Sequence, residues 1–283
     1  MEGIKNCLIL MRSLYPSMHE SEKKIADFIL EHPEIVVNMT VAQISRKVGV
    51  ADSSIVRFCQ KLGFNGFTEL KINIARNLVQ PSELIFENIN MDDDYATILS
   101  KVFASSIKAL EDSLKMLEAS EFSKAVELLL KARRIEFYGV GTSAPIAMDA
   151  YYRFMRIGLN AHVATDPHIS RISANMLDEK CVAVGISHTG RTKDTVKAVE
   201  IAKSKGTSII GITSFIDSPI SKLADCKLIT STSEARFMKE AVSSRIAQIA
   251  LLDSLYTCIA IKKYDTAVEN IENMAEILDE TRF

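Results

Sequence analysis

Two segments of the sequence combine glycine with hydroxyl side chains in the pattern of an anion site. In the first, Gly139–Pro145, two glycines allow a sharp turn, Thr142 and Ser143 present hydroxyls, and the proline suits the first turn of a helix. The second, Ser187–Thr192, reads Ser-His-Thr-Gly-Arg-Thr and leads into a helical segment. Hydroxyls and backbone N–H groups at a helix N-terminus bind phosphate, since the helix dipole favours an anion. The two segments therefore predict a site for a phosphorylated small molecule.

The first segment also fits a second kind of ligand. It matches G-x-G-x-x-A, a dinucleotide-binding fingerprint that is weak when it stands alone. This alternative requires a ribose-binding acid at the end of the next strand, and the nearest candidate is Asp166. Two phosphate-type loops on neighbouring strands favour a sugar phosphate over a dinucleotide.

A third set of residues has the chemistry of DNA contacts. Segment 50–64 places its apolar residues on one helical face and its polar and basic residues off that face. With the short helical segment that ends at Gly49, it forms a helix-turn-helix whose second helix would enter the major groove. The candidate DNA contacts are Gln43, Ser53, Ser54, Arg57 and Lys61. The serines could bond bases or phosphates, the arginine a guanine or a phosphate, and the second-helix lysine the DNA backbone, with a solvated surface as the alternative for each.

Helical periodicity predicts an all-α bundle ahead of residue 80. Ser21 can cap the first helix, Thr40 opens the second through a capping box, and glycines end the second and third. Phe64, Phe67 and Leu70 are expected in the core rather than stacked on nucleic acid. The predicted helices span 22–33, 40–47, 50–64 and 64–76.

From residue 135 on, short unbroken apolar runs alternate with helical patterns. Such runs are what a parallel sheet covered on both faces requires. We therefore predict an α/β domain with an open, doubly wound parallel sheet, in which ligands bind beyond the carboxyl ends of the strands. The runs lie at 135–140, 161–164, 181–187, 207–213 and 226–230.

Charge divides the chain in the same way. The formal net charge of the 283 residues is −2, but residues 1–80 carry +2 and residues 81–283 carry −4. Residues 40–80 contain six bases and two acids, which suggests a polyanion-binding module; a solvated basic face is the alternative.

A change of composition marks the boundary between the two parts. Residues 81–95 hold five acids, no base and a proline, which is typical of a connecting segment. We therefore expect a helix-turn-helix domain at 1–80, a linker at 81–97 and the α/β domain at 98–283.

The overall composition excludes disordered and fibrous classes, because 47% of the residues are hydrophobic and 25% are charged. The five cysteines form no C-x-x-C pair, so we expect small core residues in a reducing compartment rather than a zinc cluster or disulfides. No stretch approaches the roughly eighteen uninterrupted apolar residues of a membrane span, and the N-terminus lacks a signal-peptide cleavage pattern. We expect a cytoplasmic protein without membrane association, and neither a cofactor nor a metal.

The segment Val56–Lys71 carries a resemblance. It reads V-x-R-F-x-x-K-L-G-F-x-G-F-x-E-L-K and resembles the N-terminal domain of the RpiR family of bacterial transcription regulators. One position departs from the family's pattern, since Ala51 stands where a Ser or Thr cap is expected. Asp52 or Ser53 would then cap the helix, which alters the first base contact.

The second half resembles a sugar isomerase (SIS) domain, the phosphosugar-binding module that follows the helix-turn-helix in RpiR regulators. The Gly-Thr-Ser loop matches that family's first loop, and Thr189 replaces a serine in its S-x-S-G-x-T loop. The resemblance implies that Ser187, His188, Thr189 and Thr192 hold the phosphate and that Gly141, Thr142 and Ser143 line the sugar. Glu240 opens the helical segment 240–260 where SIS isomerases place a sugar-contacting glutamate, and a plain helix-capping role is the alternative.

Together the two resemblances cover nearly the whole chain, in the order of the RpiR family. They imply a double-stranded DNA operator and a sugar phosphate effector as partners, for a regulator of carbohydrate metabolism genes that we expect to be a repressor rather than an activator and not an enzyme. The rival hypothesis is a phosphosugar isomerase in which the N-terminal helical domain is an accessory. Its base and proton shuttle could be supplied by Glu240, His168 and His188. A third class is a sugar-sensing interaction protein that does not touch DNA. A basic helix-turn-helix has no purpose in either rival.

The resemblances also imply a homodimer or a higher homo-oligomer, because SIS domains commonly pair and a helix-turn-helix usually reads two half-sites. The long apolar helix at 246–261 is the candidate dimerisation surface. Two histidines, His162 and His168, are expected to be structural or interface residues. Three methionines are expected in the core: Met148, Met155 and Met176.

Overall fold

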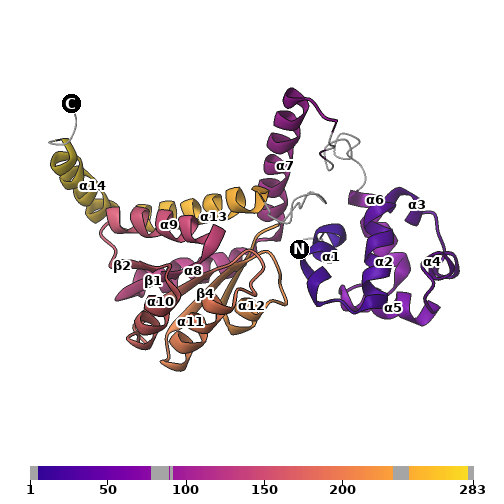
Figure 1. The fold of residues 1–283 in the computed structure, drawn as a ribbon, viewed down its shortest axis with the longest axis horizontal. Helices are drawn as coiled ribbons and strands as arrows, with labels where there is room; N and C mark the ends of the chain where they lie inside the picture. The colour runs from indigo at the N-terminus through magenta and orange to yellow at the C-terminus, as the bar shows by residue number, and fades with distance from the viewer. Residues whose placement is uncertain (1–5, 78–88, 90–91, 232–241, 280–283) are drawn as a thin grey trace. The chain divides into compact units, whose positions relative to one another are not determined.

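The computed structural model describes residues 6–77, 89, 92–231 and 242–279, which divide into two units between Ser105 and Ser106 (Figure 1). The long helix α7 (Tyr95–Met116) spans this division. Two domains of different class were predicted, one all-α and one α/β, and the structure confirms both.

The N-terminal unit is a bundle of short helices around an apolar core. Beside the 3-10 turn η1 (Tyr15–Ser17), its helices are α1 (Cys7–Leu14), α2 (Glu20–Glu31), α3 (Pro33–Val36), α4 (Val41–Val48), α5 (Asp52–Lys61) and α6 (Phe67–Asn77). The core is filled by the inward faces of these helices, among them Ile25, Ile29, Ile44, Ile55, Phe58, Leu70 and Ile74.

Two predicted details of this unit are wrong, and two helices, α1 and the short α3, were not predicted. Helix α2 begins at Glu20, so Ser21 is not its cap; Glu22 instead accepts a hydrogen bond of 2.8 Å from the His19 amide. Helix α6 begins at Phe67 rather than at residue 64. Of the two unpredicted helices, α1 is held by a distant side chain, since Asn73 on α6 accepts a hydrogen bond of 2.9 Å from the Cys7 amide.

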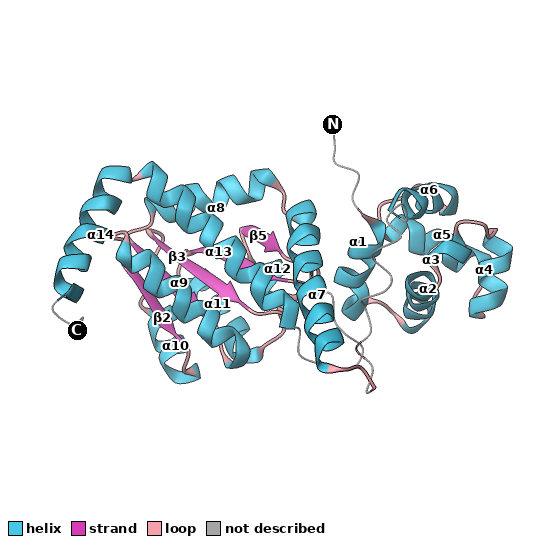
Figure 2. Ribbon diagram, turned by 90° about the horizontal axis from the view of Figure 1, so that it is seen from above, coloured by secondary structure: helices cyan, strands magenta, loops and turns pink. Residues whose placement is uncertain are grey.

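The C-terminal unit is built on a parallel sheet of five strands in the order β2-β1-β3-β4-β5. Figure 2 draws the strands in magenta among the helices, with β2, β3 and β5 labelled. The strands are β1 (Arg134–Tyr138), β2 (Ala161–Ala164), β3 (Cys181–Ile186), β4 (Ser208–Thr213) and β5 (Cys226–Ile229). The helices that follow α7, together with the 3-10 turn η2 (Gly141–Ser143), are α8 (Ala119–Lys131), α9 (Ala144–Arg156), α10 (Pro167–Asn175), α11 (Lys193–Ser204), α12 (Pro219–Leu223), α13 (Val242–Lys262) and α14 (Tyr264–Asp279). This is the predicted open parallel sheet.

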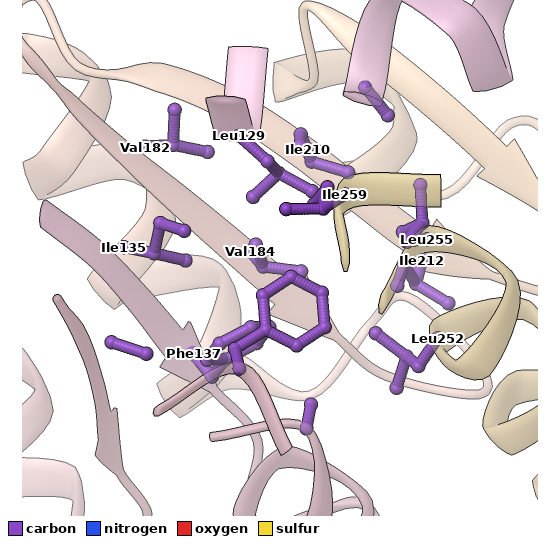
Figure 3. Close-up of a cluster of buried hydrophobic side chains, with 14 of the residues drawn as sticks. Leu129, Ile135, Phe137, Val182, Val184, Ile210, Ile212, Leu252, Leu255 and Ile259 are labelled. Carbon is purple, nitrogen blue, oxygen red and sulfur yellow. The ribbon is translucent and has the colours of Figure 1, made fainter. Parts of the chain in front are cut away.

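Helices cover the sheet on both faces, which explains why its strands are mostly apolar rather than alternating. One face packs against α8, α9 and α13, and Figure 3 shows Leu129 of α8 near Ile210 of the sheet and Leu255 of α13 near Ile212. The other face packs against α10 and α11, with Ala174 and several small residues of α11 in contact with the strands.

Helix α13 turns most of its apolar residues into this core rather than outward. Leu251, Leu252, Leu255 and Ile259 are buried, whereas Ile261 is exposed. By length and composition alone, Ser244–Lys262 is the one segment among the described helices that could cross a membrane. Its buried leucines explain that composition, because the core helix of a sheet has the same character.

The expectation for the methionines is wrong in two cases. Met148 on α9 is 53% exposed and Met176, after α10, is 70% exposed, because the inward positions of these helices are taken by other apolar residues such as Ala147 and Ala174. The expectation for the cysteines is confirmed for four of the five: Cys7, Cys59, Cys181 and Cys226 are buried. Burial raises the pKa of three of these thiols, those of Cys7, Cys59 and Cys226, to about 12.

Candidate phosphate loops and DNA-binding helix

The strand order reverses between β1 and β3, and the two predicted phosphate loops leave the sheet at this point. Strands β1 and β3 pair directly, with Tyr138 opposite Gly185. Residues 139–143 follow β1 and residues 187–192 follow β3, so both loops emerge from the carboxyl ends of adjacent strands. Ligands of open α/β sheets bind at such a switch point.

The loop after β1 is a tight turn that presents one exposed hydroxyl. A side chain at Gly139 would lie 2.8 Å from the carbonyl oxygen of Ser143, and Gly141 has a φ of +59°, so both positions favour glycine. Thr142 is exposed, while Ser143 is buried at the start of α9. The predicted glycine roles are thus explained by the backbone of this turn.

The loop after β3 is closed by its own hydroxyl groups. The Ser187 and Thr192 hydroxyl oxygens lie 3.0 Å apart, and Ser187 Oγ accepts a hydrogen bond of 3.0 Å from the Gly190 amide. Thr192 is the N-cap residue of α11, yet its side chain makes no cap bond and pairs with Ser187 instead. The N-terminus of α11 therefore opens onto this loop, as an anion site requires.

A segment that was not predicted, 213–218, supports this loop from the neighbouring strand. Thr213 Oγ1 donates a hydrogen bond of 3.0 Å to the carbonyl oxygen of His188, and the Ser214 amide donates another of 2.9 Å. A side chain at Gly190 would lie 2.1 Å from Ser218 Oγ. The signal in the sequence was a third hydroxyl cluster, Thr-Ser-Phe-Ile-Asp-Ser, directly after an apolar run.

The imidazole of His188 is fixed by two residues of the same segment. Its Nδ1 lies 3.1 Å from Ser214 Oγ, and Ser214 Oγ lies 3.2 Å from Thr230 Oγ1 at the end of β5. The Phe215 ring meets the imidazole edge-on at a centroid distance of 5.5 Å. Ser214 and Thr230 are fully buried, and through these contacts they fix the position of the His188 ring.

The acid required by the dinucleotide alternative has another role. Asp166 is the N-cap of α10, and its Oδ1 accepts hydrogen bonds of 2.9 Å from the amides of His168 and Ile169. A capping carboxylate is occupied by the helix that it stabilises. Glu240, the predicted sugar contact, lies outside the described residues. Within the described ranges, no three His, Cys, Asp or Glu side chains are grouped to hold a metal ion.

In the N-terminal unit, the turn between α4 and α5 is held by specific contacts. The predicted capping box is present, since Gln43 Oε1 accepts a hydrogen bond of 2.7 Å from the Thr40 amide, and Gly49 ends α4 with a φ of +75°. The N-cap of α5 is Ala51, which makes no side-chain cap bond. Asp52 contributes a bond to Ser45 on α4 instead.

The predicted DNA contacts differ in their availability. Ser53 and Arg57 are exposed on α5 and Ser54 is partly buried. Arg57 makes no hydrogen bond or ion pair with the part of the chain that the structure describes. Gln43 is exposed, but its side-chain oxygen serves the capping box.

Lys61 is engaged within the unit. Its ammonium lies 2.7 Å from Glu22 Oε2, which joins α5 to α2, and the same oxygen accepts the His19 amide. Burial raises the pKa of Glu22, but the hydrogen bonds from Lys61 and the His19 amide outweigh it and hold the pKa below its ordinary value. A DNA contact by Lys61 would have to compete with this ion pair.

Comparison with known proteins matches each unit to a family. Residues 5–81 match the model described as a helix-turn-helix domain of the rpiR family, and residues 128–258 match the SIS domain. An uncharacterized HTH-type transcriptional regulator of Caldanaerobacter subterraneus is 37% identical over 271 residues, which are 96% of each chain.

Two solved structures share the architecture. The Vibrio vulnificus NanR protein, complexed with ManNAc-6P, superposes with a TM-score of 0.62 at 23% identity and covers 98% of this chain and 99% of its own. A putative sugar-phosphate isomerase from Listeria monocytogenes superposes with a TM-score of 0.56 at 25% identity and covers 62% of this chain and 97% of its own.

Proposed function

Because the chain belongs to the RpiR family of helix-turn-helix transcriptional regulators with a SIS domain, we propose that it binds an operator through α5 and that a sugar phosphate bound at the switch point controls this binding. The observation that carries the proposal is the loop at 187–192, which is held together by its own hydroxyl groups and lies at the N-terminus of α11. The same chain exposes Arg57 on α5. We place the DNA-binding domain at 1–80 and the effector domain at 98–283, joined by 81–97.

In the effector domain, the loop after β3 would hold the phosphate and the loop after β1 would face the sugar. The proposed phosphate ligands are Ser187, His188, Thr189 and Thr192, and the proposed sugar contacts are Gly141, Thr142, Ser143 and Glu240. The ManNAc-6P bound by the V. vulnificus protein, which has the same fold, supports a phosphorylated sugar as the ligand class. Charge-assisted hydrogen bonds to the phosphate would supply most of the affinity.

In the DNA-binding domain, the exposed face of α5 would enter the major groove. Ser53, Ser54 and Arg57 would contact bases or phosphates, with Gln43 beside them at the start of α4. Lys61 would stay on Glu22 and hold α5 in place, which revises the DNA contact expected from the sequence.

The remaining features of the proposal concern regulation and assembly. We expect a repressor of carbohydrate metabolism genes that acts as a homodimer or higher homo-oligomer, since two half-sites require two reading helices. A protein that binds DNA in a bacterial cell would act in the cytoplasm.

The experiment that tests this function uses the full chain. A thermal-shift screen of sugar phosphates identifies the effector, because a ligand of the native state raises the unfolding midpoint. Gel shifts with genomic DNA fragments that the protein retains then measure operator affinity with and without that sugar phosphate. The unphosphorylated sugar is the control. A protein that retains no DNA specifically, or whose DNA affinity is indifferent to every stabilising sugar phosphate, would contradict the proposal.

We further propose that the SIS domain senses its ligand without converting it. Purified protein incubated with fructose 6-phosphate, glucosamine 6-phosphate, ribulose 5-phosphate and N-acetylated amino-sugar phosphates should leave their NMR spectra unchanged. Turnover of about 1 per second, ordinary for an enzyme, would establish the isomerase alternative instead.

A further inference from the structure

A buried serine of α7 is hydrogen-bonded to the carboxyl end of the sheet. Ser113 is 4% exposed, and its Oγ accepts a hydrogen bond of 2.8 Å from the Ser231 amide. The same hydroxyl donates a hydrogen bond of 2.6 Å to the Ala109 carbonyl oxygen, one turn earlier in α7. Both capacities of this hydroxyl are therefore used, and its orientation is defined.

Ser231, whose amide bonds Ser113, directly follows Thr230, one of the residues that position His188. Thr230, the neighbour of Ser231, bonds Ser214 at 3.2 Å, and Ser214 bonds the imidazole of His188 at 3.1 Å. Thr230 also donates its amide to the Thr213 carbonyl at 3.0 Å. Ser214, Thr230 and Ser231 are all at least nine-tenths buried. Three hydrogen bonds and the peptide link between Thr230 and Ser231 thus lead from His188 in the candidate phosphate loop to α7.

Helix α7 continues past the division between the two units. Its 22 residues extend over about 33 Å, and the division falls inside the helix at Ser105. Near its N-terminal end, Lys101 is 8% exposed and forms an ion pair of 2.6 Å with Asp93, which lies just ahead of the helix. Ser113 lies near the other end of α7, on the side of the division that belongs to the sheet.

We propose that Ser113 couples the phosphate loop to α7, so that a change at His188 on phosphate binding reaches the helix through Ser214, Thr230 and Ser231. This inference rests on the proposed phosphate site. The coupling exists if the Ser113–Ser231 bond differs in strength between the empty and occupied states, since an effector shifts an equilibrium only by its differential interaction with the two states. A conformation in which the buried Ser231 amide loses its acceptor is strongly disfavoured. The Ser113–Ser231 bond can therefore distinguish the two states.

The test is hydrogen exchange of the full chain with inorganic phosphate as the probe, against sodium chloride of equal ionic strength. In the wild-type protein, phosphate should slow exchange in 187–192 and change exchange in 95–116. In Ser113→Ala, protection of 187–192 should persist with phosphate affinity within about twofold of wild type, as for distant sites, while the change in 95–116 is lost. The Ser231 amide should exchange faster in this variant.

Three further variants separate coupling from mere support of the fold. Thr230→Val interrupts the path at another link and should give the same loss in 95–116. Ser113→Thr keeps a hydroxyl and should restore the response, and Ser105→Ala, on the same helix but outside the path, should leave it intact. A response in 95–116 that survives both Ser113→Ala and Thr230→Val, or wild-type protein whose loop is protected while α7 is unchanged, overturns the coupling. Absence of loop protection in the wild type overturns the phosphate site itself, and the coupling with it.

Discussion

The two units carry their candidate functional residues in opposite ways. In the N-terminal unit, Ser53 and Arg57 stand exposed on α5, and the arginine makes no bond with the described residues. In the C-terminal unit, Ser187 and Thr192 bond each other and the loop is pinned by Thr213. A DNA-reading side chain has to reach into a groove, whereas a small anion is bound well by a site already formed.

This contrast has a consequence for stability. Exposed side chains of α5 can be removed with little effect on folding, because surface substitutions change the free energy of unfolding by about 0.5 kcal/mol or less. The buried hydroxyls and glycines of the C-terminal unit support the fold and also lie in the proposed site. Function and stability should therefore separate cleanly in the first unit and remain coupled in the second.

The largest expected effect comes from removing both hydroxyls of the phosphate loop. In Ser187→Ala with Thr192→Ala, each lost charge-assisted hydrogen bond should cost about 1.5 to 3 kcal/mol, so affinity for the effector falls by roughly two orders of magnitude or more. Calorimetry with the sugar phosphate found in the screen measures this loss. Operator binding in gel shifts should persist without its response to the sugar.

Two results of this double substitution would count against the contrast. Wild-type affinity for the sugar phosphate would mean that 187–192 is not the phosphate site. Loss of DNA binding as well would make the loop a structural support for the whole chain, and the account of two separable units would be wrong.

Next in size is Gly190→Ala, which attacks the backbone of the same loop. Gly190 has a φ of +61°, and the new methyl carbon would lie 2.1 Å from Ser218 Oγ and 2.7 Å from Thr213 Oγ1. Left-handed strain and overpacking together should lower the free energy of unfolding of this unit by about 2 to 5 kcal/mol. Denaturant unfolding measures the change, and effector affinity should fall with it.

Gly206→Ala is the matched control. Gly206 also has a positive φ, of +81°, but the nearest atom to an added methyl group is 3.6 Å away on Glu179. Gly206→Ala should therefore introduce left-handed backbone strain without a steric clash, and affinity for the effector should stay at the wild-type value. Equal destabilisation by the two substitutions would mean that Ser218 and Thr213 do not brace the loop.

The same contrast explains what the sequence could predict. The helix-turn-helix is local: Thr40, Gln43 and Gly49 each act within one helix, so their spacing predicts the observed capping box and helix end. The parallel sheet is also visible, because apolar residues dominate each strand and do not alternate strictly with polar ones. Both loops at the switch point follow such runs and were predicted with them.

The supporting contacts could not be predicted, because they join segments far apart in the chain. His188 meets Ser214 across 26 residues and Ser113 meets Ser231 across 118. These pairs depend on the strand order and on where α7 packs, which local patterns do not encode. For the same reason the sequence does not predict α1, which Asn73 holds from 66 residues away, or the ion pair of Lys61 with Glu22 on α2.

A smaller effect is expected in the N-terminal unit. Arg57→Ala should weaken operator binding by about 1 to 3 kcal/mol, the size of one side-chain contact to a base. Gel-shift titration at fixed salt measures it, and effector affinity and the unfolding midpoint should stay at wild-type values. Arg57→Lys keeps the charge but not the two-pronged geometry and should recover only part of the loss. Unchanged affinity in Arg57→Ala would assign DNA reading to another surface.

The smallest effect tests whether Lys61 belongs with the exposed residues of its helix or with the contacts that hold the fold. The Lys61–Glu22 pair is partly exposed, with 31% and 20% of the two side chains accessible, so solvent screening limits its contribution. Lys61→Ala should lower the free energy of unfolding by about 0.2 to 1 kcal/mol and leave operator affinity nearly unchanged.

The folded-state pKa of Glu22 lies below its ordinary value, so the pair stabilises the protein above the unfolded-state pKa and loses that contribution as pH falls through the folded-state pKa. Urea unfolding of wild type, Lys61→Ala, Glu22→Gln and the double variant at neutral and acidic pH measures the coupling between the two side chains, which should shrink toward acid. A loss of operator affinity in Lys61→Ala as large as that in Arg57→Ala, without coupling to Glu22, would return Lys61 to the DNA surface; a loss confined to stability places it with the framework of α2 and α5.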